Sequence, residues 1–200
     1  MINTPCYTYP GTVADDLIRD PKALRALAHP FRWKLIMLLG TDGPQTATQC
    51  AEATGESVAS CSYHLNTLAK YGFVAEVPGV KGKQKPWQLV QHMQRWSGEG
   101  VDEETALAGE AAGEAFLEHA FAEIRDANRR KSLEPAEWRE ALALNGRLEF
   151  LTAQELQEIT AEVLAIIGRY SDRNDDKSAR PEGARPVRFL LSTTVSPQRD

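Results

Sequence analysis

Residues 57–71, SVASCSYHLNTLAKY, decide the fold of this chain. At about 100° per residue they predict a helix with one apolar face. That face comprises Val58, Cys61, Leu65, Leu68 and Ala69. The opposite, mostly small and polar face comprises Ala59, Ser60, Tyr63, Thr67 and Lys70. Ser57 stands where an N-cap belongs and Gly72 where a C′ residue belongs, so we expect a helix of this length that is buried on one side only.

The residues before this helix predict a shorter helix and a tight turn. Thr46 is a suitable N-cap for a short run whose apolar positions include Ala47 and Cys50, and the run ends at Thr54-Gly55. Two helices joined by a short turn that contains glycine form the helix-turn-helix layout. In that layout the second helix enters the major groove of DNA, which accepts one α-helix.

The residues after the helix predict a hairpin with a basic tip. Residues 73–77 and 87–90 alternate like half-buried strands, and the loop 78–86 between them is rich in Pro, Gly and Lys. A soluble turn would have a similar composition. Beside a recognition helix, however, we expect the loop to be a wing whose lysines contact phosphates or the minor groove.

The predicted DNA contacts come from the helix 57–71 and the wing. Ser60 and Tyr63 are expected to contact bases or phosphates, and Ala59 to contact a thymine methyl group. The full set of predicted DNA-binding residues is Ser57, Ala59, Ser60, Ser62, Tyr63, Thr67, Lys70, Lys81, Lys83 and Lys85. An ordinary solvated helix face is the alternative interpretation. His64 lies toward the flank, where packing against the preceding helix is favoured over DNA contact.

Two segments carry a resemblance to a known family. LIRDPKALRALAHPFRWKLIMLLG (17–40) and TATQCAEATGESVASCSYHLNTLAKYGFV (46–74) resemble the winged helix-turn-helix of ArsR-type transcriptional regulators. The resemblance covers roughly residues 17–95 and implies a dimeric repressor, often with two symmetric half-sites. The metal-sensing branch of that family often has a Cys-x-Cys pair before the turn, whereas this chain has only Cys50 there. We expect Cys50 and Cys61 to be core residues, and we predict neither a metal site nor a cofactor.

The charge is distributed unevenly along the chain. Residues 17–95 carry a net charge of +5 and residues 96–200 a net charge of −8, within a total of −5. A cationic module on an anionic body fits a part that binds phosphates and a part that faces something else. The chain has no long apolar run, no secretion signal and none of the common catalytic motifs. We therefore expect a cytoplasmic protein that is neither a membrane protein nor an enzyme.

The chain predicts a mainly α fold with small β elements. We divide it into an N-terminal arm (1–16), a winged helix-turn-helix domain (17–95) and a C-terminal helical or α+β dimerisation domain (101–200). Within the last domain, 147–151 and 187–195 alternate like two strands, which we expect to pair with each other. This half also resembles, through LTAQEL and RPVRFLL, the extra domain of actinobacterial ArsR-like regulators.

The C-terminal half also holds helices and a loop. Residues 102–131 predict the longest helix, further helices are expected at 135–144 and after Thr152, and residues 171–186 are expected to form a mobile loop.

The long helix is the predicted dimer interface. Its large apolar residues recur every three to four positions, as they would on a core helix or a dimer helix. Because terminal helices commonly make the dimer in the resembled family, we assign the interface to Leu107, Phe116, Leu117, Phe121 and Ile124. Trp96 and Trp138 lie beside this helix in the sequence and could line an effector pocket. Their alternative role as core or interface anchors is the stronger interpretation.

The sequence thus predicts a homodimeric ArsR-like repressor of transcription. The helix 57–71 would read the major groove of a palindromic operator in double-stranded DNA, and the wing 78–86 would contact phosphates or the minor groove. One alternative is a DNA-binding protein without a small-molecule effector. The other is a protein-interaction module that uses the winged helix as a scaffold.

Overall fold

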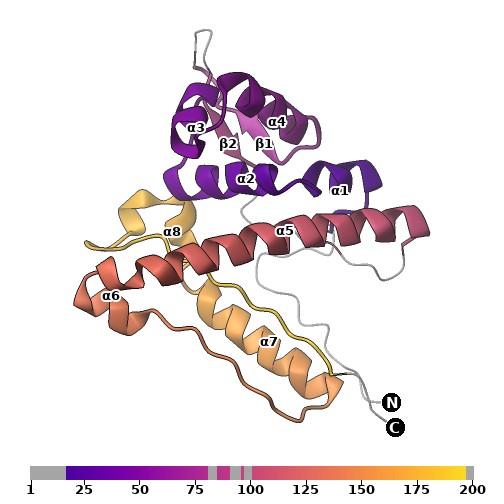
Figure 1. Ribbon diagram of the computed structural model, residues 1–200, viewed down its shortest axis with the longest axis vertical. Helices are drawn as coiled ribbons and strands as arrows, with labels where there is room; N and C mark the ends of the chain where they lie inside the picture. Colours follow the sequence, from indigo (N-terminus) through magenta and orange to yellow (C-terminus); the bar gives the residue numbers. More distant parts are fainter. Residues whose placement is uncertain (1–16, 81–84, 91–95, 97–100, 197–200) are drawn as a thin grey trace.

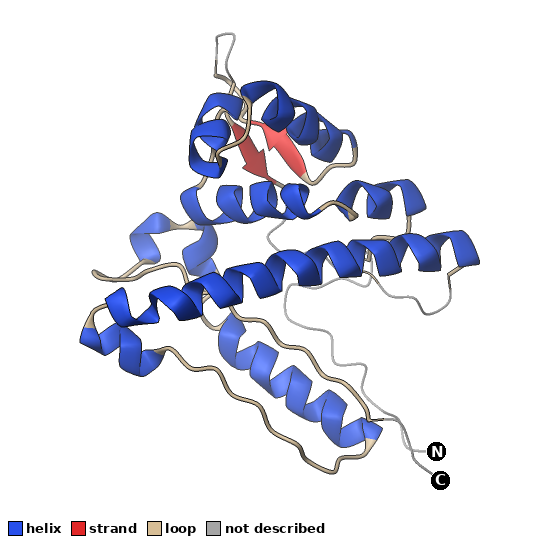
Figure 2. Ribbon diagram, in the orientation of Figure 1, coloured by secondary structure: helices blue, strands red, loops and turns tan. Residues whose placement is uncertain are grey.

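The computed structural model describes residues 17–80, 85–90, 96 and 101–196 (Figure 1). In chain order the helices and strands are α1 (Pro21–Leu27), α2 (Pro30–Asp42), α3 (Ala47–Thr54), α4 (Val58–Lys70), β1 (Val74–Glu76), β2 (Trp87–Leu89), α5 (Glu103–Arg130), η2 (Lys131–Leu133), α6 (Ala136–Ala141), α7 (Ala153–Gly168), α8 (Asp172–Asp175) and η3 (Lys177–Ala179). Helices dominate, and the described strands form one two-stranded sheet (Figure 2). The expected mainly α fold with small β elements is confirmed.

Three layers make up the N-terminal part of the molecule. In Figure 1, α3, α4 and the hairpin lie on one side of α1 and α2, and α5 crosses the other side. The layers share a core of large, fully buried side chains: Leu24, Leu27, Trp33, Leu35, Ile36, Cys50, Cys61, Leu65, Leu68 and Val74. Burial of this apolar surface provides the main driving force for the assembly of the three layers.

Local signals determine where the first two helices begin and end. Asp20 caps α1 by accepting a hydrogen bond from the backbone N–H of Lys22 at 2.9 Å, and proline occupies the first helical position. The N-cap of α2 is His29, whose Nδ1 accepts a hydrogen bond from the Phe31 N–H at 3.2 Å. This helix runs past Gly40 and stops before Gly43, where φ is 81°. A glycine adopts that left-handed conformation without the steric cost of a side chain.

The hairpin joins the helices through backbone hydrogen bonds. The strands β1 and β2 pair antiparallel with Val74 opposite Leu89, and Gln45 forms a bridge with Trp87 through bonds of 3.0 and 2.8 Å. Each strand is shorter than the sequence predicts. The bridge ties the residue just before α3 to the strand that follows the wing, so the wing and the α3–α4 pair are held together.

Helix α5 packs through its small residues. At 1.5 Å per residue it is about 42 Å long, and it contacts α1 and α2. Its buried positions are Thr105, Ala108, Gly109, Ala112, Ala115, His119 and Ala120. The predicted apolar stripe is therefore rotated away from the core in part, because small side chains allow a closer approach between helices than leucine or phenylalanine do. Phe116 alone among the predicted interface residues packs against the core cluster.

The C-terminal part differs from the sequence prediction. The segments 147–151 and 187–195 are not strands, so the expected α+β unit is wrong for the single chain; among the described residues no strand follows β2. Figure 1 shows the reason, because α7 lies between the two segments and keeps their backbones apart. The stretch expected as a mobile loop contains the short helices α8 and η3. The predicted arm, 1–16, lies outside the described residues.

Candidate nucleic-acid interface

Helix α4 presents one buried and one open face. Ser57 Oγ accepts a hydrogen bond from the Ser60 N–H at 3.1 Å, which confirms the predicted N-cap. Cys61, Leu65 and Leu68 are fully buried against the core. Val58 is 45% exposed, contrary to its assignment to the apolar face, because it stands in the first turn, where the helix projects from the core.

The open face carries the predicted readers. Tyr63 is 65% exposed in the middle of the helix. Ser57, Ala59 and Lys70 are also exposed, whereas Ser60, Ser62 and Thr67 are half-buried. The Thr67 hydroxyl donates to the backbone oxygen of Tyr63 at 2.9 Å, which leaves its lone pairs free to accept. The helix therefore presents a phenol, small polar groups and a terminal cation to whatever it meets.

Sequence reasoning missed Asn66 on the same face. This residue is exposed, and its Nδ2 donates to the backbone oxygen of Ser62 at 2.7 Å. Asparagine can bond adenine through both its amide nitrogen and its oxygen. The signal was present, because residues four apart in a helix share a face and Asn66 lies midway between Ser62 and Lys70.

In the described end of the wing, the predicted cation already has a partner of opposite charge. Lys85 Nζ forms an ion pair with Glu76 Oε2 at 2.6 Å, and both side chains are partly exposed. The other two predicted wing cations, Lys81 and Lys83, lie outside the described residues. A phosphate that approached Lys85 would compete with the carboxylate of Glu76, so this lysine is a weaker phosphate ligand than its sequence suggests.

Behind the open face, Arg32 links three helices. Its Nε donates to His64 Nδ1 at 3.3 Å, and its NH1 donates to the backbone oxygens of Ala26 at 2.7 Å and Arg25 at 3.3 Å. These contacts connect α4 to the C-terminal end of α1 through α2. Arg32 thus fixes the angle at which α4 leaves the core, a role that spacing along the chain does not reveal.

His64 lies in an aromatic cluster against the start of α2, not against α3, the helix just before it. Its ring centroid is 4.7 Å from that of His29 and 5.1 Å from those of Phe31 and Tyr63. Burial lowers the pKa of His64, and the neighbouring His29 and Arg32 lower it further. A neutral imidazole in this position accepts the Arg32 bond and supports the Tyr63 ring from behind.

The two described cysteines are core residues, as predicted. Cys50 and Cys61 are both fully buried, and Thr54 Oγ1 lies 3.8 Å from Cys61 Sγ. Burial, with a smaller contribution from Cys61, raises the pKa of the Cys50 thiol to about 11. A thiol with so high a pKa is a poor nucleophile and a poor metal ligand. Within the part of the chain that the structure describes, no group of three or more His, Cys, Asp and Glu residues is placed to hold a metal ion.

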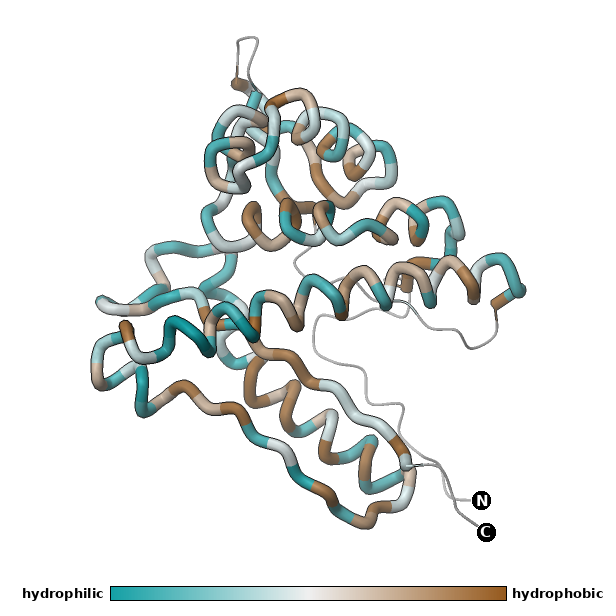
Figure 3. Tube along the Cα trace, viewed as in Figure 1, coloured by the Kyte–Doolittle hydropathy of each residue, from teal (hydrophilic) through white to brown (hydrophobic). Residues whose placement is uncertain are grey.

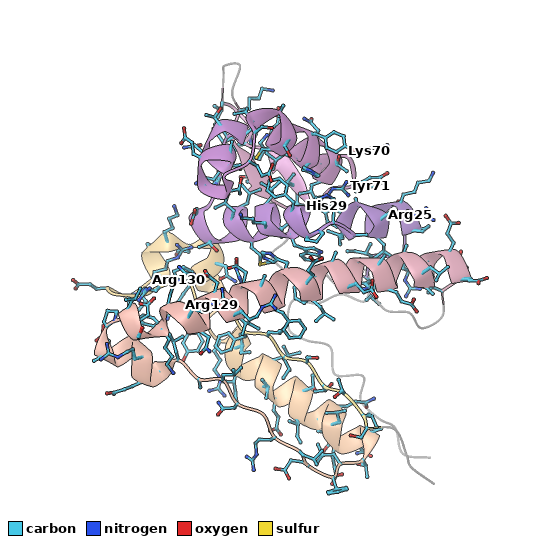
Figure 4. All side chains as sticks on the ribbon, viewed as in Figure 1. Arg25, His29, Lys70, Tyr71, Arg129 and Arg130 are labelled. Atoms are coloured by element: carbon cyan, nitrogen blue, oxygen red, sulfur yellow. The ribbon has the colours of Figure 1, made fainter. Side chains whose placement is uncertain are left out.

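Polar side chains line one side of the N-terminal part from α4 down to α1. Figure 4 shows Lys70, Tyr71, His29 and Arg25 along one side of the N-terminal part. Arg25 forms an ion pair with Glu104 of α5 at 2.7 Å, and both partners are more than half exposed. Arg25 and His29 were not among the predicted contacts. The signal for them lies only in the fold, which brings α1 and the start of α2 beside the end of α4.

The predicted dimer residues fall into two groups. Leu107 and Phe121 are 58% and 52% exposed on α5, and Leu117 is also exposed. Phe116 instead packs on Trp33, with ring centroids 5.0 Å apart, and Ile124 is half-buried. The exposed residues remain available to a second chain, whereas Phe116 is used by its own core.

The structure does not bring the two candidate pocket tryptophans together. Trp96 packs over Gly109 and lies 5.9 Å from Trp33 between ring centroids, whereas Trp138 in α6 stacks under Arg185 at 4.8 Å. From Gly109 to the end of α5 is about 30 Å along the helix. An open depression of about 400 Å³ between α1 and α5 is lined by neither tryptophan but by Arg25, Glu103, Glu104, Leu107, Ala108 and Ala111.

Comparison with known proteins agrees with this geometry. Residues 27–77 match a family model described as a helix-turn-helix domain. The match and the arrangement of α3 and α4 both indicate a helix-turn-helix domain, a type of domain that binds DNA in transcription regulators. This domain extends from the end of α1 to just past β1 and includes α4 with its open face. No curated protein matches the chain. None of the described helices is both long and apolar enough to cross a membrane.

Proposed function

We propose that this helix-turn-helix protein is a homodimeric, ArsR-like repressor that binds a palindromic operator in double-stranded DNA. The observation that carries the proposal is the open face of α4, on which Tyr63 is exposed while the opposite face is locked into the core. The exposed ring of Tyr63 leaves apolar surface in contact with water, which is unfavourable unless a partner covers the ring. Its hydroxyl can donate to or accept from a base edge in the major groove.

The surroundings of α4 support the same role. Lys70 ends the helix and supplies a cation for a phosphate beside the groove, while Arg25 on the same side of the molecule is paired with Glu104. The exposed Leu107, Leu117 and Phe121 of α5 give a second copy an apolar surface to contact. A two-fold dimer would place two α4 helices on successive major grooves, which explains the expectation of a palindromic site.

The test separates base readout from phosphate binding. Tyr63→Ala should lower affinity for the selected operator by roughly 1–3 kcal/mol and leave binding to a scrambled duplex nearly unchanged. Lys70→Ala is the matched control on the same helix, and it should weaken both duplexes about equally. Competition binding at fixed salt measures both. An unchanged specificity ratio in Tyr63→Ala would mean that α4 does not read the bases.

The two rival functions predict other results. A protein-interaction module would bind duplex DNA weakly and with little dependence on salt, because few counterions would be released. A DNA-binding protein without an effector would show the Tyr63 effect but no ligand that changes operator affinity. Trp96 and Trp138 lie far apart on the single chain, so the proposal names no effector.

A further inference from the structure

Two segments of the C-terminal part have the sequence of strands but no partner strand. Residues 147–151 and 187–195 run extended in Figure 1. None of these residues shares a backbone–backbone hydrogen bond with another described residue. Unpaired strand edges readily pair with another chain, so the absence of a partner within the described fold calls for a physical account.

Both segments contain a run of alternating apolar residues. In the first segment Leu148 and Phe150 alternate with Arg147 and Glu149, and successive residues of a strand point to opposite sides. In the second segment Val187, Phe189, Leu191 and Val195 would share one side of a strand, and the half-buried Leu190 would lie on the other side with Arg188. Seven large apolar residues of the two segments are exposed, including Leu151, and Phe150 is 98% exposed. So many exposed large apolar residues on two short segments mark a surface that another surface covers.

Within one chain the two segments do not meet. Helix α7 lies between them, and the second segment is held on its own side by two ion pairs. Arg185 bonds Glu134 at 2.7 Å, and Arg188 bonds Glu123 at 3.1 Å. The partner strand must therefore come from elsewhere, and a second copy of the chain carries both segments in the same unpaired state.

We propose that residues 147–150 of one copy pair antiparallel with residues 187–190 of a second copy. This inference rests on the dimer of the proposed function and adds a specific interface to it. The register that best satisfies the charges sets Glu149 opposite Arg188. The same register sets Leu148 opposite Phe189 and Phe150 opposite Val187, so apolar side chains face one another on one side of the sheet. On the other side Glu149 faces Arg188, and Arg147 faces Leu190.

The pairing has little to displace and a helix to pack on. Two exposed ion pairs must open, Arg188–Glu123 at 3.1 Å and Arg147–Glu149 at 2.9 Å, and because exposed pairs contribute little, exchanging their partners costs little. Ile159 and Ile166 of α7 are 45% and 52% exposed and lie seven residues apart, on one face of the helix. They offer the apolar side of the new sheet a helix face. By two-fold symmetry each dimer contains two copies of this strand pair.

Charge reversal tests which chain supplies the partner. Glu149→Arg and Arg188→Glu, each as a pure homodimer, place like charges opposite each other twice and should weaken the dimer about tenfold each. An equimolar mixture of the two variants restores both opposite-charge pairs in the heterodimer. Sedimentation of differently labelled proteins should therefore show that the mixed dimer forms with nearly the wild-type dissociation constant.

Matched controls exclude a general charge effect. Glu52→Arg reverses an exposed charge on α3, a helix that packs on α2 and α4, and should leave the dissociation constant unchanged. Glu123→Gln removes the present partner of Arg188 and should not weaken the dimer. If the segments paired within one chain, the single variants would fail to rescue each other in the mixture, and the inference would be overturned.

Hydrogen exchange tests the backbone pairing independently. Amides in 147–150 and 187–190 should be protected, and the protected fraction should rise with the dimer fraction as the wild-type chain is concentrated. A dimer whose segments exchange freely would overturn this inference but leave the proposed dimer through α5 intact. A wild-type chain that stays monomeric at all concentrations would overturn the proposed dimer itself. Protection that does not depend on concentration would assign the strands to a single chain and overturn the intermolecular pairing.

Discussion

The part of the chain up to Ala120 and the part after it bury their apolar residues very differently. All the buried hydrophobic side chains lie between Ala23 and Ala120, and among the described residues after Ala120 no side chain is buried. Figure 3 nevertheless shows hydrophobic stretches along α7 and both flanking segments. The later part therefore does not lack apolar residues; it lacks neighbours for them.

The difference does not come from local helix signals. The capping box of α7, in which Thr152 and Glu155 bond each other's backbone, has the same form as that of α3, made by Thr46 and Gln49. The N-termini of both helices are thus stabilised in the same way. Neighbouring elements cover the apolar face of α3, whereas α7 lacks such neighbours. Good caps therefore determine where a helix begins, but not what the helix packs against.

The largest expected effect is a difference in stability loss between two variants, one that removes a buried aromatic side chain and one that removes an exposed aromatic side chain. Trp33 is 2% exposed at the centre of the core, and Trp33→Ala should destabilise the fold by about 3–5 kcal/mol. Phe150→Ala removes a fully solvated ring and should change stability by about 0.5 kcal/mol or less in the monomer. Urea unfolding of the dilute chain measures both. A similar loss in both variants would show that Phe150 has a covered environment even in dilute solution.

A smaller effect is expected at the contact between α5 and the N-terminal part. A Cβ built on Gly109 lies 3.3 Å from Trp96 Cδ1, so the branched side chain of Gly109→Val must displace the indole and should cost about 1–3 kcal/mol. Gly113→Ala is the matched variant one turn later, where the added Cβ lies 4.0 Å from Trp96. Since that contact is ordinary, the gain in helix propensity should stabilise the protein by about 0.5–1 kcal/mol.

Thermal unfolding followed by tryptophan fluorescence measures this pair. The Gly109 variant should also shift the emission of Trp96, because the indole must move. If both variants gave the same stability, the contact between α5 and Trp96 would be loose, and the contrast between the two parts of the molecule would be weaker than the structure indicates.

The helix-turn-helix part could be predicted because its signals are local. Ser57, Thr46 and Asp20 each cap a helix within three residues of themselves, and hydrophobic periodicity placed Cys61, Leu65 and Leu68 inside. These interactions depend on nearest neighbours in the sequence, so the sequence alone contains them. The open face of α4 then consists of the residues that this periodicity leaves outside the core.

Other features depend on contacts that no spacing encodes. The buried face of α5 uses Ala108, Gly109 and Ala112, whereas periodicity favoured the large residues, because it cannot tell whether a neighbour lies close enough to need small ones. The role of Arg32 requires α1 and α4 to meet, and the two strand-like segments failed to pair because α7 separates them. In each case the deciding partner is distant along the chain.

The smallest expected effect concerns pH and the border between the two parts. His119 is buried on α5, and its Nε2 has no hydrogen-bond partner among the described residues. Burial lowers its pKa; the Glu123 carboxylate opposes this, and Arg188 and Lys34 add to it. In the unfolded chain the imidazole regains a pKa of about 6.5, so it takes up a proton at a higher pH than in the fold.

Stability should therefore fall as the pH drops below about 6.5, because the unfolded state binds the proton first, and the fall should continue until the pH passes the lowered pKa of the folded state. His119→Gln should reduce this slope, measured as the urea midpoint between pH 7 and pH 5. Burial also lowers the pKa of His64. His64→Gln is therefore a second test, and it should remove a separate share of the same dependence of stability on pH. The carboxylates of the C-terminal part, such as Glu134 and Asp176, have lowered pKa values and lose their stabilising charge only at more acidic pH. If neither histidine variant changed the slope, buried imidazoles would not be the acid-sensitive groups, and the pH response would have to come from the exposed part of the molecule instead.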